Sequence, residues 1–312
     1  MIVAEQLSKR FGPRAAVEEV SLQVARGEVV GFLGPNGAGK TTTLRILAGV
    51  FPPTAGRAIV DGCDVVRDPL AARRRVGYAP ERPALYGEMT VEGLLAFVAA
   101  MRDLVGARQR AAVGLAVERA GLTTVRARRI GALSRGFRQR VGIAVALVGD
   151  PPALLLDEPT AGLDPAQSAE TRRLIRALGS ERAVLVSSHA LAEVETISDR
   201  VVILYRGRVL AAEPPASLAR RLRPASRVDV EATAPADALA ATLAAVPGVR
   251  SVERLPGADG QARCRVELEP ARDVRPALAA SVLARGWGLL ALTPVETSLE
   301  EAFLTLVGRE AP

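Results

Sequence analysis

The chain has 312 residues, of which 49% are hydrophobic and 24% charged, and its 41 basic and 34 acidic residues give a net charge of +7. This composition is that of an ordinary globular protein, and the length suits about two domains, so a disordered chain is excluded. The aromatic content of 3% argues against a nucleic-acid surface built on base stacking. Two cysteines, Cys63 and Cys264, are too few for a disulfide framework or a four-cysteine zinc site, and we expect a reducing compartment.

The N-terminal segment does not have the pattern of a signal peptide. Residues 1–10 contain Glu5, Lys9 and Arg10 and no central apolar run. The longest apolar stretches, such as residues 141–149, fall well short of the roughly 18 residues that a membrane-spanning helix needs. If a membrane is involved, we expect another chain to span it.

Short apolar runs alternate with helical patterns along the first two thirds of the chain. Strands are predicted at residues 27–33, 153–156 and 183–187. Each run is nearly all apolar, which is typical of parallel strands that are covered on both faces. A helix is predicted to begin near Lys40, and residues 90–147 are mostly helical in pattern. We therefore predict an α/β fold with a parallel-rich sheet and an inserted helical subdomain at about residues 85–150.

The composition changes to proline, alanine and arginine near residues 213–227, which is typical of a domain boundary. Beyond it the patterns predict an order close to βαββαβ, followed by a last helix. The strands include residues 227–233 and 262–268, the helices include residues 236–245 and 274–283, and the last helix lies near residues 298–307. We predict two domains, residues 1–220 and a small α/β accessory domain at residues 225–312, in which we find no functional motif.

Residues 34–42 (GPNGAGKTT) match the phosphate-loop pattern G-x-x-x-x-G-K-[ST] between a predicted strand and a predicted helix. In such a loop, glycines let successive backbone N–H groups converge on phosphate oxygens at the positive end of the following helix. Lys40 would reach the β- and γ-phosphates, and the Thr41 hydroxyl would bind Mg²⁺. A chance glycine-rich turn is the alternative, but the loop holds the chain's one asparagine and one of its two lysines. The predicted nucleotide-binding residues here are Gly34, Asn36, Gly37, Gly39, Lys40, Thr41 and Thr42.

Residues 153–159 (ALLLDEP) supply two acids at the end of a predicted buried strand. Asp157 is placed to hold Mg²⁺, directly or through water, and Glu158 to polarise an attacking water as general base. A strand-end turn closed by Pro159 is the structural alternative. The preceding phosphate loop favours the catalytic interpretation.

Between these motifs, residues 133–140 (LSRGFRQR) resemble the LSGGQ signature of the nucleotide-binding subunits of ABC transporters. The resemblance implies that Ser134 and Gly136 of one subunit cap the γ-phosphate that is bound to the phosphate loop of another. Arg135 and Phe137 stand where the family usually has Gly and Gln. Ser134 can also act as an ordinary helix N-cap, and the two interpretations are compatible.

Three smaller features stand at positions that are functional in this family. Residues 161–164 (AGLD) resemble the D-loop, with Asp164 as its acid. His189 resembles the switch histidine, and the resemblance implies that it contacts the γ-phosphate and orders the attacking water beside Glu158. Phe11 resembles the aromatic residue that stacks on adenine, and a position in the core is its alternative.

Glu81, in residues 77–81 (GYAPE), occupies the place of the Q-loop, where most family members have a glutamine. That glutamine binds Mg²⁺ and couples the site to the membrane partner. A carboxylate can also bind Mg²⁺ but adds negative charge beside the phosphates. We expect Glu81 to remain a metal ligand that senses nucleotide.

The resemblance covers about residues 2–220, and the signature, Glu81 and the C-terminal addition are most similar to the ATP-binding subunits of ABC-2-type exporters. It implies a P-loop NTPase core that uses ATP and Mg²⁺ and closes head to tail as a homodimer or as paired nucleotide-binding subunits. It also implies an integral membrane permease as partner, contacted by residues 82–100, and a peripheral place at the cytoplasmic face of the membrane. ATP hydrolysis would then power export by the permease.

Two other classes are weighed against this one. Soluble ABC ATPases that act on ribosomes or DNA usually carry two nucleotide-binding halves, a long coiled coil or zinc-binding cysteines, whereas this chain has one phosphate loop and neither of the others. A phosphate-loop kinase or GTPase would lack the ordered signature, D-loop and switch histidine. We expect no nucleic-acid partner.

The positive charge is concentrated in residues 102–140, where ten arginines face only Asp103 and Glu118. Two interpretations are open. The segment can present a solvated face, or its arginines can contact ATP phosphates, anionic lipid or the membrane partner.

Overall fold

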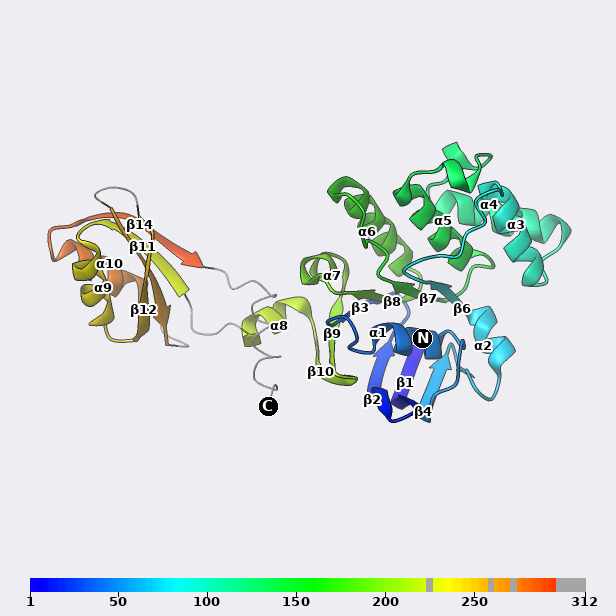
Figure 1. Cartoon of the computed structure of the whole chain (residues 1–312), viewed down its shortest axis with the longest axis horizontal. Helices are drawn as coiled ribbons and strands as arrows, with labels where there is room; N and C mark the ends of the chain where they lie inside the picture. Colours follow the sequence, from blue (N-terminus) through cyan, green and yellow to red (C-terminus); the bar gives the residue numbers. More distant parts are fainter. Residues whose placement is uncertain (223–226, 258–260, 270–273, 296–312) are drawn as a thin grey trace. The chain divides into compact units, whose positions relative to one another are not determined.

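The computed structural model describes residues 1–222, 227–257, 261–269 and 274–295. The chain divides into two compact units, Met1–Pro215 and Ala216–Pro312 (Figure 1). The helix predicted near residues 298–307 lies outside the described residues. Within the described part of the chain, every helix is too short or too polar to cross a membrane.

A six-stranded sheet forms the centre of the first unit, in the order β10-β9-β3-β8-β7-β6. Its strands are β3 (Val29–Leu33), β6 (Val76–Ala79), β7 (Ala153–Asp157), β8 (Ala183–Ser188), β9 (Arg200–Tyr205) and β10 (Arg208–Glu213). All neighbouring pairs are parallel except β9 and β10. Every residue of β3, β7 and β8 is buried, which explains why they are apolar except at the carboxyl ends of β7 and β8, and the order of strands confirms the predicted parallel-rich sheet.

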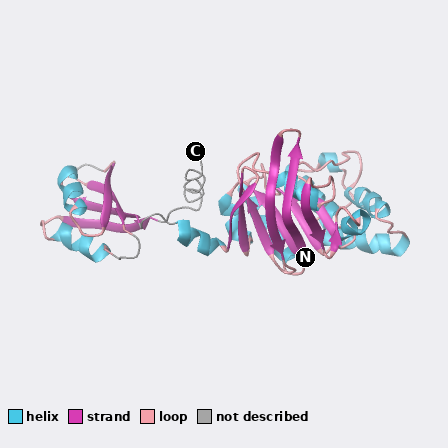
Figure 2. Cartoon of the chain, turned by 90° about the horizontal axis from the view of Figure 1, so that it is seen from below, coloured by secondary structure: helices cyan, strands magenta, loops and turns pink. Residues whose placement is uncertain are grey.

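A second, antiparallel sheet has the order β2-β1-β4-β5, and its long strands are seen in Figure 2. It consists of β1 (Ile2–Phe11), β2 (Arg14–Val24), β4 (Ala55–Val60) and β5 (Cys63–Asp64). The sequence did not predict it, because β1 is interrupted by shifts of register and by a positive φ of 48° at Gln6, which break the simple alternation of side chains. Helix α1 (Lys40–Leu47) contacts strands of both sheets.

The predicted helical insertion lies between β6 and β7 along the chain. It consists of α3 (Val91–Met101), α4 (Gly106–Arg119), two short 3₁₀ turns (Thr123–Val125 and Ile130–Ala132) and α5 (Arg135–Leu147). The Thr90 side chain accepts a hydrogen bond from the backbone N–H of Gly93 at 3.0 Å and so caps α3. The other helices of this unit are α2 (Pro69–Arg75), α6 (Pro165–Gly179) and α7 (Leu191–Ile197), and α8 (Pro215–Leu222) follows β10.

The arginines of residues 102–140 are mostly engaged within the chain. Four pair with acids outside the segment: Arg119 with Asp150, Arg126 with Glu92, Arg129 with Glu88 and Arg140 with Glu170. Three others, Arg102, Arg135 and Arg138, donate to backbone carbonyls. These contacts engage seven of the ten arginines without an external anion, and four of the seven are with acids, which favours a solvated face over contacts with ATP phosphates, anionic lipid or the membrane partner.

The second unit has the predicted βαββαβ order, with an antiparallel sheet in the order β12-β13-β11-β14, as in ferredoxin-like folds. Its elements are β11 (Arg227–Thr233), α9 (Ala236–Ala244), β12 (Val249–Leu255), β13 (Ala262–Leu268), α10 (Arg275–Leu283) and β14 (Gly288–Val295). It has a core of its own, in which Val230, Leu239, Val266 and Leu278 are fully buried. Cys264 is a free, buried thiol in this core, and burial raises its pKa, which keeps the sulfur protonated.

Asp229 forms a buried polar centre on the face of this sheet that points away from the apolar core. Its carboxylate accepts two hydrogen bonds from Arg265, at 2.8 and 3.0 Å, and one from Arg263 at 3.0 Å. These bonds, those from Arg265 first, hold the pKa of Asp229 below its ordinary value of 3.8. The resulting stabilisation of the folded state is complete above the pKa that Asp229 has in the unfolded chain. It is lost as the pH falls through the lower pKa that Asp229 has in the folded state.

We expect Asp229→Asn to lower the free energy of unfolding of the second unit by about 2 kcal/mol at pH 7 and by less at pH 3. Urea unfolding of the full chain can be followed through the fluorescence of Trp287, the one tryptophan, which lies against the core of this unit. Asp237→Asn is the control, because the carboxylate of Asp237 is 83% exposed. An equal loss at both pH values would contradict the role given to the Asp229 charge.

Candidate active site

The phosphate loop joins β3 to α1 and folds around the ammonium group of Lys40. Lys40 is only 6% exposed, and its Nζ donates to the carbonyl oxygens of Gly34 at 2.6 Å and Pro35 at 3.3 Å. Gly39 has a φ of 109°, and a Cβ at this position would lie 2.5 Å from the carbonyl oxygen of Ala16. Glycine is therefore required there by both conformation and space.

The acids at the end of β7 lie beside the start of α1. The Asp157 carboxylate accepts hydrogen bonds from the hydroxyls of Thr41 at 3.2 Å and Ser187 at 2.7 Å. Ser187 also accepts from the backbone N–H of Glu158 at 3.0 Å, so it fixes both acids of the motif. The hydroxyl of Thr41 and the carboxylate of Asp157 are hard oxygen donors that converge at the phosphate loop, and this pair fits Mg²⁺.

Tyr78, in β6, is a site residue that the sequence analysis did not single out. Its hydroxyl donates to Asp157 Oδ2 at 3.4 Å. Burial, followed by the negative charge of Asp157, raises the pKa of the phenol, so it stays protonated and able to donate. Residues 77–81 were recognised as a motif for the sake of Glu81, and no pattern in them marked the tyrosine.

Glu158 contacts both Lys40 and His189. Its Oε1 lies 3.4 Å from the Lys40 Nζ, and its Oε2 lies 2.8 Å from the His189 Nδ1. Because an ionised carboxylate can only accept, Nδ1 carries the proton in this contact. Glu158 has a φ of 47°, in the left-handed region, where a residue other than glycine is held only by its surroundings. The chain therefore turns sharply after β7, at Glu158 itself.

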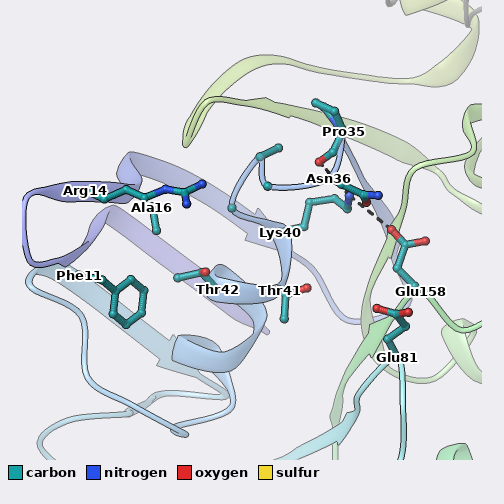
Figure 3. A pocket seen from close by; sticks show the side chains of 13 residues that line it. Phe11, Arg14, Ala16, Pro35, Asn36, Lys40, Thr41, Thr42, Glu81 and Glu158 are labelled. Carbon is teal, nitrogen blue, oxygen red and sulfur yellow. Dashed lines mark hydrogen bonds and ion pairs between the residues drawn. The ribbon is translucent and has the colours of Figure 1, made fainter.

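A cavity of about 370 Å³ opens over the phosphate loop (Figure 3). It is lined by Phe11, Arg14, Ala16, residues 35–42, Glu81 and Glu158. The structure thus brings predicted residues from the N-terminal strands, the phosphate loop, the Q-loop place and the end of β7 to one cavity. Gly34 is the first residue of the loop, and its carbonyl oxygen accepts from Lys40. His189 contacts the site through its hydrogen bond to Glu158.

Phe11 and Arg14 lie at one end of this cavity. Phe11 is 50% exposed, meets Phe51 edge to face at 5.7 Å, and has the Lys9 ammonium 5.4 Å from its ring centre, so it is not a core residue. Arg14 was not predicted, although its guanidinium lies near Gly37 of the phosphate loop (Figure 3). An arginine in a chain with so many of them gave no signal.

The signature and D-loop residues have local structural roles and do not appear among the described residues that line the cavity. Ser134 caps α5 by accepting from the N–H of Phe137 at 3.4 Å, and Asp164 caps α6 by accepting from the N–H of Gln167 at 2.9 Å. Gly136 is buried, and a Cβ there would meet the Gln167 side chain at 2.4 Å.

Arg135, which replaces the usual glycine of the signature, donates to the carbonyl oxygen of Ala161 at 2.9 Å. It therefore ties the signature helix to the D-loop of its own chain.

A glycine-rich loop between strand and helix, a lysine over its carbonyls and two acids at the end of another strand of the same sheet define the P-loop class of nucleoside triphosphatases. Comparison with known proteins identifies the family within this class. Residues 17–161 match the family model described as ABC transporter. The bacitracin transport ATP-binding protein BcrA of Bacillus licheniformis is 37% identical over 225 residues, which cover 72% of each chain. The chain therefore belongs to the ABC transporter family, among its ATP-binding proteins, as its signature motif indicated.

Two further relatives differ in how much of their length matches this chain. The probable multidrug ABC transporter ATP-binding protein YbhF of Escherichia coli (strain K12) is 37% identical over 219 residues, which cover 70% of this chain but only 38% of YbhF. The chain thus spans well under half the length of that relative. The linearmycin resistance ATP-binding protein LnrL of Bacillus subtilis (strain 168) is 29% identical over 310 residues, 99% of each chain.

Among solved structures, the dimeric post-hydrolysis state of the ATP-binding cassette MJ0796, bound to ADP and Pi, superposes with a TM-score of 0.62 at 26% identity. The match covers 69% of this chain and 99% of that one.

Proposed function

We propose that this chain binds ATP with Mg²⁺ and hydrolyses it, and that two copies closing head to tail use this cycle to drive export by a membrane partner. The arrangement of Glu158 carries the proposal, because this carboxylate contacts the phosphate-loop lysine on one side and His189 on the other. A base beside a phosphate-binding cation is what hydrolysis of a terminal phosphate requires.

ATP binding follows from the cavity and its cations. The backbone N–H groups of residues 37–41 and the Lys40 ammonium would bind the phosphates, and Phe11 would stack on the adenine. Thr41 and Asp157 would hold Mg²⁺, with Glu81 at the edge of the same cavity. The metal, when bound, would neutralise the phosphate charge.

Hydrolysis follows from the acid and the histidine. Glu158 would accept the proton of the attacking water, and His189 would hold the carboxylate in place through Nδ1 while its Nε2 remains free for the water or the γ-phosphate. Ser187 keeps the backbone of Glu158 fixed during this step.

The second copy would complete the site. Ser134, Gly136 and Asp164 lie outside the cavity of their own chain, and in the proposal they cap the ATP bound by the other copy. The dimeric MJ0796 cassette supports this arrangement. Closing on ATP and opening after hydrolysis would shift the membrane partner between two states.

Export is inferred from the relatives, whose names refer to bacitracin transport and to a probable multidrug transporter. The chain would work at the cytoplasmic face of a membrane, where residues 82–100 contact an integral membrane permease. This chain would then bind and hydrolyse ATP, and the permease would recognise the transported substrate.

The test is to purify the chain together with the membrane protein that accompanies it, to reconstitute both into vesicles, and to measure ATP hydrolysis with and without that partner. We expect the partner to stimulate hydrolysis. Salt-sensitive binding to DNA or ribosomes, without any stimulation, would instead favour a soluble ABC ATPase.

The same vesicles test Glu81. Glu81→Gln removes a carboxylate from the cavity, and we expect it to raise the Mg²⁺ concentration needed for half-maximal hydrolysis and to change the stimulation by the partner. Glu195→Gln, at an exposed position of α7, is the control. If both measurements stay at the wild-type values, the negative charge of Glu81 contributes neither to metal binding nor to the sensing of nucleotide.

A further inference from the structure

Glu193, in α7, connects the two chain segments that carry Glu158 and His189. Its Oε2 accepts hydrogen bonds from the hydroxyls of Thr160 at 2.5 Å and Ser188 at 3.2 Å. Thr160 follows Glu158 by two residues, and Ser188 directly precedes His189. One carboxylate oxygen of Glu193 therefore holds the segment after Glu158 and the segment before His189. The side chains of Glu158 and His189 are themselves 2.8 Å apart, from Oε2 to Nδ1.

These hydroxyls depend on Glu193 because they are shielded from water. Thr160 is 6% exposed and Ser188 is 2% exposed, so water cannot readily replace the carboxylate as acceptor. The single proton of Ser188 has a second acceptor, the carbonyl oxygen of Ala190 at 3.4 Å, but the carboxylate is nearer and charged.

Glu193 also contacts a cation of α6, the helix that follows the D-loop. Arg172, in α6, lies with its guanidinium 3.8 Å from Glu193 Oε1. Glu193 thus joins the segment after the base, the segment before the histidine and α6, while the cavity lining does not include it.

We propose that Glu193 is a positioning residue, which keeps Glu158 and His189 in register for hydrolysis without touching the nucleotide. The inference rests on the proposed function, since it assigns Glu193 to the same base and histidine. Loss of Glu193 frees both flanks at once, and small displacements of a base from its water are costly in rate.

The expected result is a split between kcat and KM. Glu193→Ala lowers kcat for ATP on the order of 10- to 100-fold, while KM for ATP stays close to the wild-type value. Glu193→Gln keeps an acceptor oxygen on a side chain of the same length, and it restores most of kcat. Glu195→Ala, at an exposed glutamate of the same helix, leaves both constants unchanged.

A double-mutant cycle separates this role from a general effect on folding. Because Glu193 acts through the pair of Glu158 and His189, the loss of kcat caused by Glu193→Ala is smaller in a chain that already carries His189→Ala than in the wild-type chain. Thr160→Val removes one hydroxyl with little change of shape and lowers kcat in the same direction, which keeps the test open if Glu193→Ala does not fold.

Three results would overturn the inference: an unchanged kcat in Glu193→Ala and Thr160→Val, a rise in KM that accounts for the whole effect, or a full additional loss in the double variant. The rate of ATP hydrolysis by Glu158→Gln is measured in the same experiment. If it hydrolyses ATP normally, the proposed role of Glu158 as the base fails; if it is inactive while Glu193→Ala is not, only the role of Glu193 fails.

Discussion

Glu158→Gln is expected to bind ATP but to hydrolyse it about 10²- to 10⁴-fold more slowly than the wild-type chain. Gln has the same length and can still accept the hydrogen bond from His189 Nδ1, so the site keeps its shape while the proton acceptor is lost. Since opening of the dimer follows hydrolysis in the proposed cycle, the variant should accumulate as an ATP-bound dimer. Phosphate release measures the first effect, and size-exclusion chromatography with Mg²⁺ and ATP measures the second.

Glu195→Gln serves as the matched control for this variant, because it makes the same substitution at an exposed position. It should hydrolyse ATP at the wild-type rate and show no additional dimer. A Glu158→Gln chain that hydrolyses ATP normally would remove Glu158 as the base, whatever its oligomeric state.

Lys40→Ala should weaken ATP binding by about 3 kcal/mol, which is on the order of a hundredfold in Kd. Lys40 is the buried cation of the cavity lining, and its loss removes the ammonium group that lies within the phosphate loop. Equilibrium binding of a fluorescent ATP analogue, measured with the full chain, gives the affinity directly.

Arg67→Ala removes an exposed cation that lies outside the cavity lining and should leave Kd unchanged. Equal affinities for the Lys40→Ala and wild-type chains would contradict the phosphate-loop assignment. A loss in both variants would point to the overall charge of the chain instead.

The sequence predicted the elements whose burial is uniform. Strands β3, β7 and β8 are covered on both faces, so each contains a run of at least four apolar or glycine residues that can be recognised without knowing its partner strands. The antiparallel sheet was missed because its long strand β1 bends at Gln6 and shifts register, so the alternation of its side chains breaks. Boundaries of the helices in the second unit agreed closely, because their apolar spacing is regular.

The candidate site was predicted where its residues are consecutive in the chain. Lys40 and Thr41 belong to one motif and Asp157 and Glu158 to another, so spacing alone identified them. Arg14, Tyr78, Ser187 and Glu193 reach the site only through the packing of separate strands and helices. Nothing in a single sequence reports contacts between residues that lie far apart in it.

The contacts of the Lys40 ammonium have a consequence for how the site would receive ATP. An ammonium group has three N–H donors, and here it contacts three oxygens, those of Gly34, Pro35 and Glu158. In the proposed function, a phosphate oxygen would reach Lys40 by displacing one of these three oxygens, so ATP binding would be an exchange of partners. If Glu158 is the partner displaced, the carboxylate proposed as the base would leave Lys40 when its substrate binds.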